Sequence, residues 1–160
     1  MKSRDLSRKV QAGRLIGALL RVPYFTVTQR VYETLIAAGF DDISHTHLIV
    51  FQNFDEEHGS RLTQLAHKSN MTKQAMAYLV NHLKECDYLE DRPDPRDGRA
   101  RRLYLTARGL ALVHLAIETV RAVEADWTEL IGEEQMKTLK QILKELVAIL
   151  EEPDLEMRMY

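Results

Sequence analysis

The stretch that decides the fold is Leu62 to Gly109, which reads LTQLAHKSNMTKQAMAYLVNHLKECDYLEDRPDPRDGRARRLYLTARG. Apolar residues follow a helical spacing over 62–68 and again over 72–86, and a polar Ser-Asn pair separates the two segments. Beyond 87 the period changes to two, and two expected strands, 88–92 and 99–106, enclose a turn-rich tip at 93–98. The stretch therefore predicts a short helix, a tight turn, a longer helix and a β-hairpin.

The longer helix, expected over 72–86, has two faces of different chemistry. At 100° per residue, Met76, Leu79, Val80 and Leu83 cluster on one side. The opposite side presents Gln74, Ala77, Tyr78 and Asn81. A face that is only solvated usually carries more Glu and Lys. This polar but uncharged face therefore favours hydrogen bonding to a partner over the alternative, an ordinary amphipathic surface helix.

The major groove of B-DNA admits one α-helix and exposes the hydrogen-bonding edges of the bases. Gln74, Tyr78 and Asn81 carry side chains that can read such edges. Thr72 is expected to cap the helix, and the free N–H groups at this end, supported by Lys73, can meet a backbone phosphate. The helix thus has the features of a DNA recognition helix.

The tip of the predicted hairpin is basic, because Arg96 and Arg99 flank an Asp97-Gly98 turn. Arginine suits a narrow minor groove, where negative potential is concentrated. An acidic residue beside a polyanion is explained if Asp97 orients an arginine guanidinium. The alternative is an Asp-Gly pair chosen for turn geometry, with solvated arginines around it.

Helix, turn, helix and basic hairpin together predict a winged helix-turn-helix, a mainly α fold with a small β-hairpin wing (α+β). We expect its DNA-binding residues to be Thr72, Lys73, Gln74, Ala77, Tyr78, Asn81, Arg96, Asp97 and Arg99.

Helical segments flank this lobe on both sides. A long first helix carries apolar residues from Leu15 to Leu35 and ends at Gly39, and a second begins at Ser44 and includes Phe54. A further helix from Ala107 carries one apolar stripe of Val113, Ile117, Val120, Trp127 and Leu130 and is broken at Gly132. The last helix repeats apolar residues at spacings of three and four, an a/d heptad seam of Met136, Leu139, Leu143, Leu146 and Leu150. We expect a homodimer to bury this surplus apolar surface. The alternative is a monomer whose helices pack on one another.

Charge is unevenly divided along the 160 residues, although 22 Lys and Arg nearly balance 24 Asp and Glu. Residues 60–110 carry ten basic and six acidic side chains, whereas 31–59 carry six acidic and no basic ones. A basic middle could address a polyanion while the remaining surface repels it. The alternative is ordinary charge scatter.

Composition and motifs exclude several classes of protein. Cys86 is the only cysteine and rules out a disulfide framework, and no apolar run near the N-terminus is long enough for a membrane span, so we expect a cytoplasmic protein. Enzyme motifs such as HExxH, GxSxG and a phosphate-binding glycine loop are missing from the sequence. His45 and His47 invite a metal site, but positions i and i+2 of a helix point to different faces. We expect neither catalysis nor a cofactor.

Residues 62–109 resemble the core of the MarR family of transcriptional regulators. The resemblance rests on the Leu-Ala pair of the short helix, Arg92, the Asp97-Gly98-Arg99 tip and the closing Leu-Thr-Ala-Arg-Gly of 105–109. It implies that the wing arginine is Arg99 with Asp97 as its partner, and that the N- and C-terminal helices form a dimer. One departure is Asp87, where the family usually has a glycine.

The resemblance also implies a small effector, often aromatic or phenolic, that releases DNA. Tyr24, Phe25, His45, His47 and Phe51 lie on segments that could line its pocket, although such residues are more often plain core. Some relatives sense oxidants through a cysteine, but acidic neighbours of Cys86 disfavour a thiolate, which favours a structural role.

The sequence therefore predicts a ligand-responsive repressor that binds double-stranded DNA as a homodimer on an inverted repeat. We expect a single domain over 1–160, with a DNA-binding lobe at 44–109 and a helical dimerisation region at 1–40 and 110–152. The alternative is a helical module that uses the same fold to bind protein.

Overall fold

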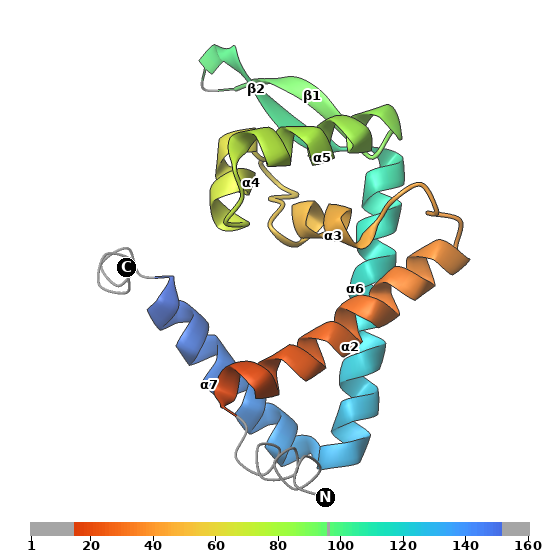
Figure 1. Ribbon diagram of the computed structural model, residues 1–160, viewed down its shortest axis with the longest axis vertical. Helices are drawn as coiled ribbons and strands as arrows, with labels where there is room; N and C mark the ends of the chain where they lie inside the picture. Colours follow the sequence, from red (N-terminus) through yellow and green to blue (C-terminus); the bar gives the residue numbers. More distant parts are fainter. Residues whose placement is uncertain (1–14, 96, 152–160) are drawn as a thin grey trace, which may run out of the picture. The chain divides into compact units, whose positions relative to one another are not determined.

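The computed structural model describes residues 15–95 and 97–151, and it confirms a mainly helical fold with one antiparallel hairpin. In chain order the elements are α2 (Ile16–Ala37), α3 (His45–Gln52), α4 (Leu62–Lys68), α5 (Lys73–Glu85), β1 (Leu89–Asp94), β2 (Asp97–Leu105), α6 (Ala107–Ile131) and α7 (Glu133–Leu150) (Figure 1). The succession α4, turn, α5 and hairpin is the predicted winged helix-turn-helix.

The chain divides into two units within α6, one ending at Thr119 and the other beginning at Val120. The first unit contains the winged helix-turn-helix, and the second contains α7. The predicted division into a lobe at 44–109 and a helical region at 1–40 and 110–152 stays a prediction.

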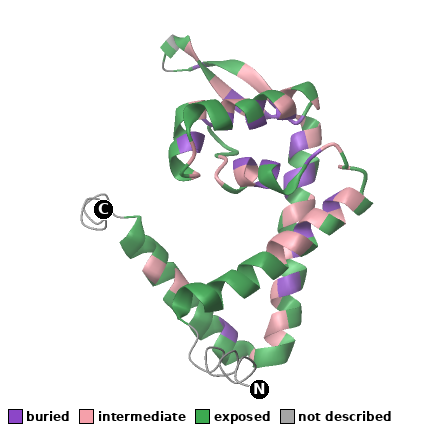
Figure 2. Cartoon of the chain, viewed as in Figure 1, coloured by how far each residue is buried: buried purple, intermediate pink, exposed green. Residues whose placement is uncertain are grey.

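Burial of one face of α5 organises the first unit. The side chains of Met76, Leu79, Val80 and Leu83 are all buried, as their spacing predicted. α5 packs against α3, α4 and β1, and Figure 2 shows buried residues on these facing elements. At the start of the helix, the Thr72 hydroxyl oxygen accepts a hydrogen bond from the Ala75 N–H at 3.2 Å, which confirms the expected N-cap.

The turn that leaves α5 requires a left-handed residue, and Asp87 supplies it with φ of 60°. The Tyr88 N–H returns to the Leu83 carbonyl at 2.8 Å, so the chain reverses sharply into β1. An aspartate therefore adopts the geometry that glycine adopts most easily.

Strands β1 and β2 pair from Leu89 with Leu105 up to Asp94 with Asp97, with an irregularity at Pro93 and Asp94. Both strands extend further toward the tip than the sequence indicated, since the expected strands were 88–92 and 99–106. On the other side of β2, the backbones of Ser60 and Leu103 exchange two hydrogen bonds of 2.9 and 3.0 Å. The hairpin is therefore held by the loop before α4 as well as by its own pairing.

The predicted closing motif of the wing has a steric reason. A Cβ atom at Gly109 would lie 2.2 Å from the Tyr88 carbonyl oxygen, so only glycine permits this approach of α6 to the turn. The Thr106 hydroxyl oxygen also accepts a hydrogen bond from the Gly109 N–H at 3.1 Å. The end of the hairpin and the start of α6 are thereby locked together.

Two helix predictions were wrong in detail. α3 begins after Ser44 as expected but ends at Gln52, because Asn53 turns its amide back to the Ile49 carbonyl at 3.2 Å; Phe54 lies outside the helix. In α6 the predicted apolar stripe includes Ile117, which is 39% exposed, whereas the unpredicted Leu112 is fully buried. Helical periodicity located these helices but did not decide which apolar side packs within the chain.

Within the second unit, α6 ends at Ile131 and α7 begins at Glu133; Gly132, with φ of 90°, separates the two helices. Lys140 of α7 pairs with Glu124 of α6 at 2.6 Å. Of the seam residues only Met136 is buried, and Figure 2 shows α7 exposed along most of its length. Among the described residues, no helix is long and apolar enough to cross a membrane.

Candidate nucleic-acid interface

The outer face of α5 is open to solvent. Gln74, Tyr78 and Asn81 are exposed, Tyr78 by 76%, and Ala77 is half-buried beside them. The structure thus places all four predicted side chains on one face, opposite the buried one. An exposed aromatic ring between two amides offers both hydrogen bonds and an apolar contact to base edges.

The N-terminal end of α5 adds positive character to this face. Thr72 and Lys73 are both exposed, and the first turn of the helix contains no acidic residue. Unpaired N–H groups at a helix N-terminus favour an anion, which a phosphate would supply.

The tip of the wing differs from the prediction in one respect. The Asp97 carboxylate accepts a hydrogen bond from the Arg99 backbone N–H at 3.1 Å, whereas the expected contact was with the guanidinium. Asp97 therefore shapes the turn, since a short acidic side chain readily bonds the backbone two residues on. The Arg99 side chain is exposed, and Arg96 lies outside the described residues.

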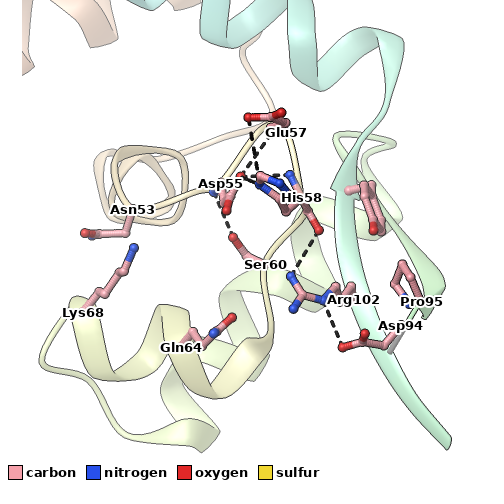
Figure 3. Close-up of a pocket in the computed structure, with 11 residues that line it drawn as sticks. Asn53, Asp55, Glu57, His58, Ser60, Gln64, Lys68, Asp94, Pro95 and Arg102 are labelled. Atoms are coloured by element: carbon pink, nitrogen blue, oxygen red, sulfur yellow. Dashed lines mark hydrogen bonds and ion pairs between the residues drawn. The ribbon is translucent and has the colours of Figure 1, made fainter. Parts of the chain in front are cut away.

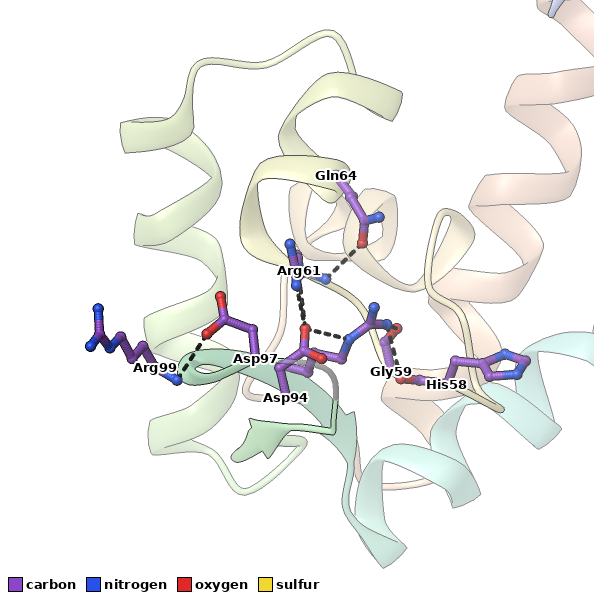
Figure 4. A network of polar contacts seen from close by, with 8 residues as sticks. His58, Gly59, Arg61, Gln64, Asp94, Asp97 and Arg99 are labelled. Atoms are coloured by element: carbon purple, nitrogen blue, oxygen red, sulfur yellow. Dashed lines mark hydrogen bonds and ion pairs between the residues drawn. The ribbon is translucent and has the colours of Figure 1, made fainter.

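An ion-pair cluster that the sequence did not predict is centred on Asp94, the last residue of β1. The carboxylate of Asp94 is fully buried and accepts hydrogen bonds from Arg61 at 2.6 and 2.9 Å and from Arg102 at 2.9 Å (Figure 4). Arg102 also donates to the carbonyls of His58 and Gly59. The only hint in the sequence was an acidic residue within a basic hairpin, because Arg61 is 33 positions away.

A second cluster, on the C-terminal side of α5, is formed by Asp42, Tyr88 and Arg108. The buried Tyr88 hydroxyl donates to the Asp42 carboxylate, which also pairs with Arg108 at 2.9 Å. The Arg108 guanidinium lies over the Tyr88 ring at 4.3 Å. Burial tends to raise the pKa of Asp42, but the hydrogen bonds from Tyr88 and Arg108 outweigh burial and lower it below its ordinary value.

Two histidines connect this cluster to α3 and α5. His82 of α5 hydrogen-bonds the Asp42 carbonyl at 2.7 Å, and its ring stacks on that of His47 with 4.5 Å between centroids. His47 accepts the Ser44 N–H through Nδ1 at 2.9 Å, and its buried Nε2 has no hydrogen-bond partner in the described part of the chain. Burial and the neighbouring His82 lower the pKa of His47.

The expected divergence of His45 and His47 is confirmed. His45 contacts Gln29 at 3.0 Å and the Tyr32 ring, whereas His47 lies inside against His82. Across the described residues, no three His, Cys, Asp or Glu side chains are grouped to hold a metal ion.

Cys86 follows α5, and its surroundings disfavour the thiolate. Burial, followed by the Asp42 carboxylate, raises the pKa of the thiol. The sequence indicated the same direction but assigned it to the flanking acidic residues, of which only Glu85 contributes, and least. A raised pKa is consistent with a structural cysteine.

A cavity of about 580 Å³ lies between the 53–60 loop, α4 and the hairpin (Figure 3). Its lining is mostly polar and comprises Asn53, Asp55, Glu57, His58, Ser60, Gln64, Lys68, Asp94, Pro95, Arg102 and Tyr104. None of the five residues proposed from the sequence to line an effector pocket lies here. The cavity borders the Asp94 cluster and has the wrong polarity for an apolar aromatic ligand.

The elements and their exposed side chains define a winged helix-turn-helix protein in which the outer face of α5 is polar and exposed. Comparison with known proteins places it more narrowly: residues 41–100 match the model of the MarR family. The match spans α3, α4, α5, β1 and the start of β2, and it agrees with the resemblance drawn from the sequence.

Solved structures of the same fold cover nearly the whole chain. A transcriptional regulator from Thermotoga maritima is 26% identical, with 85% of this chain and 94% of that one covered and a TM-score of 0.59. The MarR-family protein Rv2887 of Mycobacterium tuberculosis, in a complex with DNA, is 24% identical, with 84% and 98% covered and a TM-score of 0.63. MepR of Staphylococcus aureus, bound to ethidium bromide, is 19% identical, with 86% and 97% covered and a TM-score of 0.54. No curated protein sequence gave a match.

The lowered pKa of His47 predicts a specific loss of stability in acid. Below the ordinary pKa of about 6.5 the unfolded chain binds a proton that the folded chain refuses, so the free energy of unfolding falls as pH decreases. In His47→Gln this part of the pH dependence should vanish, whereas His67→Gln, at an exposed position of α4, should retain it. Urea unfolding between pH 7.5 and 5 measures the difference; equal slopes in wild type and His47→Gln would contradict the assignment.

Proposed function

We propose that this protein is a transcriptional regulator that binds specific sequences of double-stranded DNA. The observation that carries the proposal is the outer face of α5, where Gln74, Tyr78 and Asn81 are exposed while the opposite face is buried. That face is positioned as a helix entering the major groove requires. The DNA complex of the related Rv2887 supports the same partner for this fold.

The wing supports a second contact with DNA. The exposed Arg99 is held at the hairpin tip by the turn that Asp97 shapes, and Arg101 is exposed on the same strand. Exposed arginines on a narrow hairpin suit the minor groove beside the site that α5 reads. We therefore assign sequence reading to α5 and a shape-dependent contact to the wing.

We propose that the protein acts as a homodimer. In the single chain, large apolar side chains of α2 are exposed, including Ile16 by 70% and Phe25 by 62%. On α7, the seam residues Leu139 and Leu150 are each more than 40% exposed, and Ile142, outside the seam, is 56% exposed. A second copy is the partner that would bury both surfaces, and twofold symmetry would present two recognition helices to an inverted repeat.

We further propose that the protein is a cytoplasmic repressor that responds to a small ligand. Its support is the match of residues 41–100 to the MarR family model, and the binding of ethidium, an aromatic compound, by the structurally similar MepR. The effector would be a small aromatic or phenolic molecule.

Selection from a pool of random duplexes tests the DNA-binding proposal. Two recognition helices of a dimer should meet major grooves about 34 Å apart, so the selected sites should be inverted repeats. Affinity should fall by about 0.9 log units per log unit of salt for each phosphate neutralised. A pool without enrichment, or a flat salt response, would favour the alternative, a protein-binding module.

The two DNA-contacting elements should fail differently when altered. Gln74→Ala or Asn81→Ala should relax sequence preference, because each base contact contributes about 1 to 3 kcal/mol of discrimination. Arg99→Ala should weaken binding to all sites, most of all those with an A/T-rich flank. Titrations against the selected operator and its single-base variants measure both; an Arg99→Ala protein with altered base preference but normal affinity would contradict the assignment.

The dimer is tested on α7. Leu143 and Leu146 are half-buried in the single chain, and replacing both by Glu should yield monomers or unfolded chain, since an unpaired charge is costly to bury. Lys144→Glu, at an exposed position between them, changes the charge without touching the seam and should remain dimeric. Sedimentation at micromolar concentration makes the measurement, and a folded wild-type monomer would refute the dimer.

A further inference from the structure

We propose that Asp94 is a positioning residue for DNA binding, which fixes the wing tip against the N-terminal end of α4 through Arg61 and Arg102. The inference rests on the proposed function, because it concerns how the wing reaches DNA. In this proposal Asp94, whose side chain is fully buried, orients the wing without contacting DNA itself.

The Asp94 carboxylate is the centre of the cluster. Its Oδ2 accepts hydrogen bonds from Nε and Nη2 of Arg61, at 2.9 and 2.6 Å, and from Nε of Arg102 at 2.9 Å. The carboxylate is fully buried, while the side chain of Arg61 is 39% and that of Arg102 is 14% exposed. Three charge-assisted bonds to one oxygen hold both guanidinium planes in fixed directions.

Both arginines tie the hairpin to the segment that precedes α4, at neighbouring positions. Arg61 is the residue that immediately precedes α4, so its bond joins the wing to the first helix of the helix-turn-helix. Arg102 continues the link, because its Nη1 donates to the carbonyls of His58 and Gly59 at 3.1 and 3.0 Å. The loop before α4 and strand β2 therefore meet at Asp94, as Figure 4 shows.

The position of Asp94 in the hairpin makes this link relevant to the tip. Asp94 is the last residue of β1 and pairs with Asp97, the first residue of β2. The strand register is irregular between Pro93 and Asp94, so regular pairing alone does not define the direction of the tip. Anchoring Asp94 from outside the hairpin supplies the missing constraint, and Arg99 lies two residues beyond Asp97.

The charge of Asp94 allows a sharp test, because a purely electrostatic effect and a positioning effect predict opposite changes in DNA affinity when the charge is removed. Replacing an acidic residue near a polyanion should strengthen binding if charge alone decides. If Asp94 positions the tip, Asp94→Asn should weaken binding despite the favourable change in charge. Asp91→Asn is the matched control, since Asp91 is on the same strand, pairs with Lys84 and is partly exposed.

Affinities of wild type, Asp94→Asn, Asp91→Asn and Arg99→Ala are measured on the selected operator and on a copy with G/C-rich flanks. We expect Asp94→Asn to lose about tenfold or more on the A/T-rich flank, a difference of about 1.4 kcal/mol, and to approach Arg99→Ala. Its discrimination among half-site bases should stay within about twofold of wild type. Asp91→Asn should bind as tightly as wild type or more tightly.

A double-mutant cycle adds a second readout. If Asp94 acts through the tip, the losses caused by Asp94→Asn and Arg99→Ala should be strongly non-additive. Arg61→Gln cuts the link to α4 while leaving the Asp94 and Arg102 pair inside the hairpin, and it should show the same flank-specific loss. It also keeps the test decisive if circular dichroism shows that Asp94→Asn is unfolded.

The outcomes separate the two proposals. Binding by Asp94→Asn equal to that of Asp91→Asn, or an equal loss on both flanks together with relaxed half-site preference, would overturn the positioning role and leave DNA binding intact. Absence of wild-type binding to any duplex would overturn the proposed function, and the positioning role with it.

Discussion

Burial of the inner face of α5 is the constraint on which the rest of the structure depends. Met76 and Leu83 are completely inaccessible, and Leu79 and Val80 nearly so, between α3, α4 and β1. Because a helix has one orientation once such a stripe is buried, the opposite face is fixed in solvent. The exposure of the outer face of α5 is therefore a consequence of packing.

Two carboxylates extend this order from the core to the polar parts of the lobe. Asp42 joins the loop before α3 to the turn after α5 and to α6, and Asp94 joins the wing tip to the start of α4. Both are paired with arginine; the Asp42 side chain is 33% exposed, whereas that of Asp94 is fully buried and needs such a partner. Asp42 thereby holds the turn after α5, and Asp94 holds the hairpin tip; both segments lie outside the helices.

The two parts of the molecule use apolar surface differently. In the winged helix-turn-helix lobe the large aliphatic side chains are enclosed within a single chain, whereas α7 encloses only Met136. A heptad seam that stays exposed or half-buried apart from one residue is typical of a helix that packs on a partner. In the proposed dimer, each winged helix-turn-helix lobe would have its own core, and the remaining helices would form the interface between the two copies.

The sequence by itself determined the elements and the faces of α5, because helix period, caps and turn residues act over a few positions. Thr72 as the cap, Met76 and Leu83 as core and Gln74 as an outer residue were all readable in this way. Packing contacts could not be predicted in this way. The structure was therefore needed to show which side of α6 is buried and where α3 ends.

The tertiary structure alone decided the polar clusters around the site. Asp94 and Arg61 are 33 positions apart, and Tyr88 and Asp42 are 46 apart, so no local pattern pairs them. Asp97 illustrates the same limit: its proximity to Arg99 was readable, but whether it would bond the backbone or the guanidinium depended on the conformation of the turn. Periodicity reports which side of an element is apolar, whereas pairing of charges requires the fold to bring distant segments together.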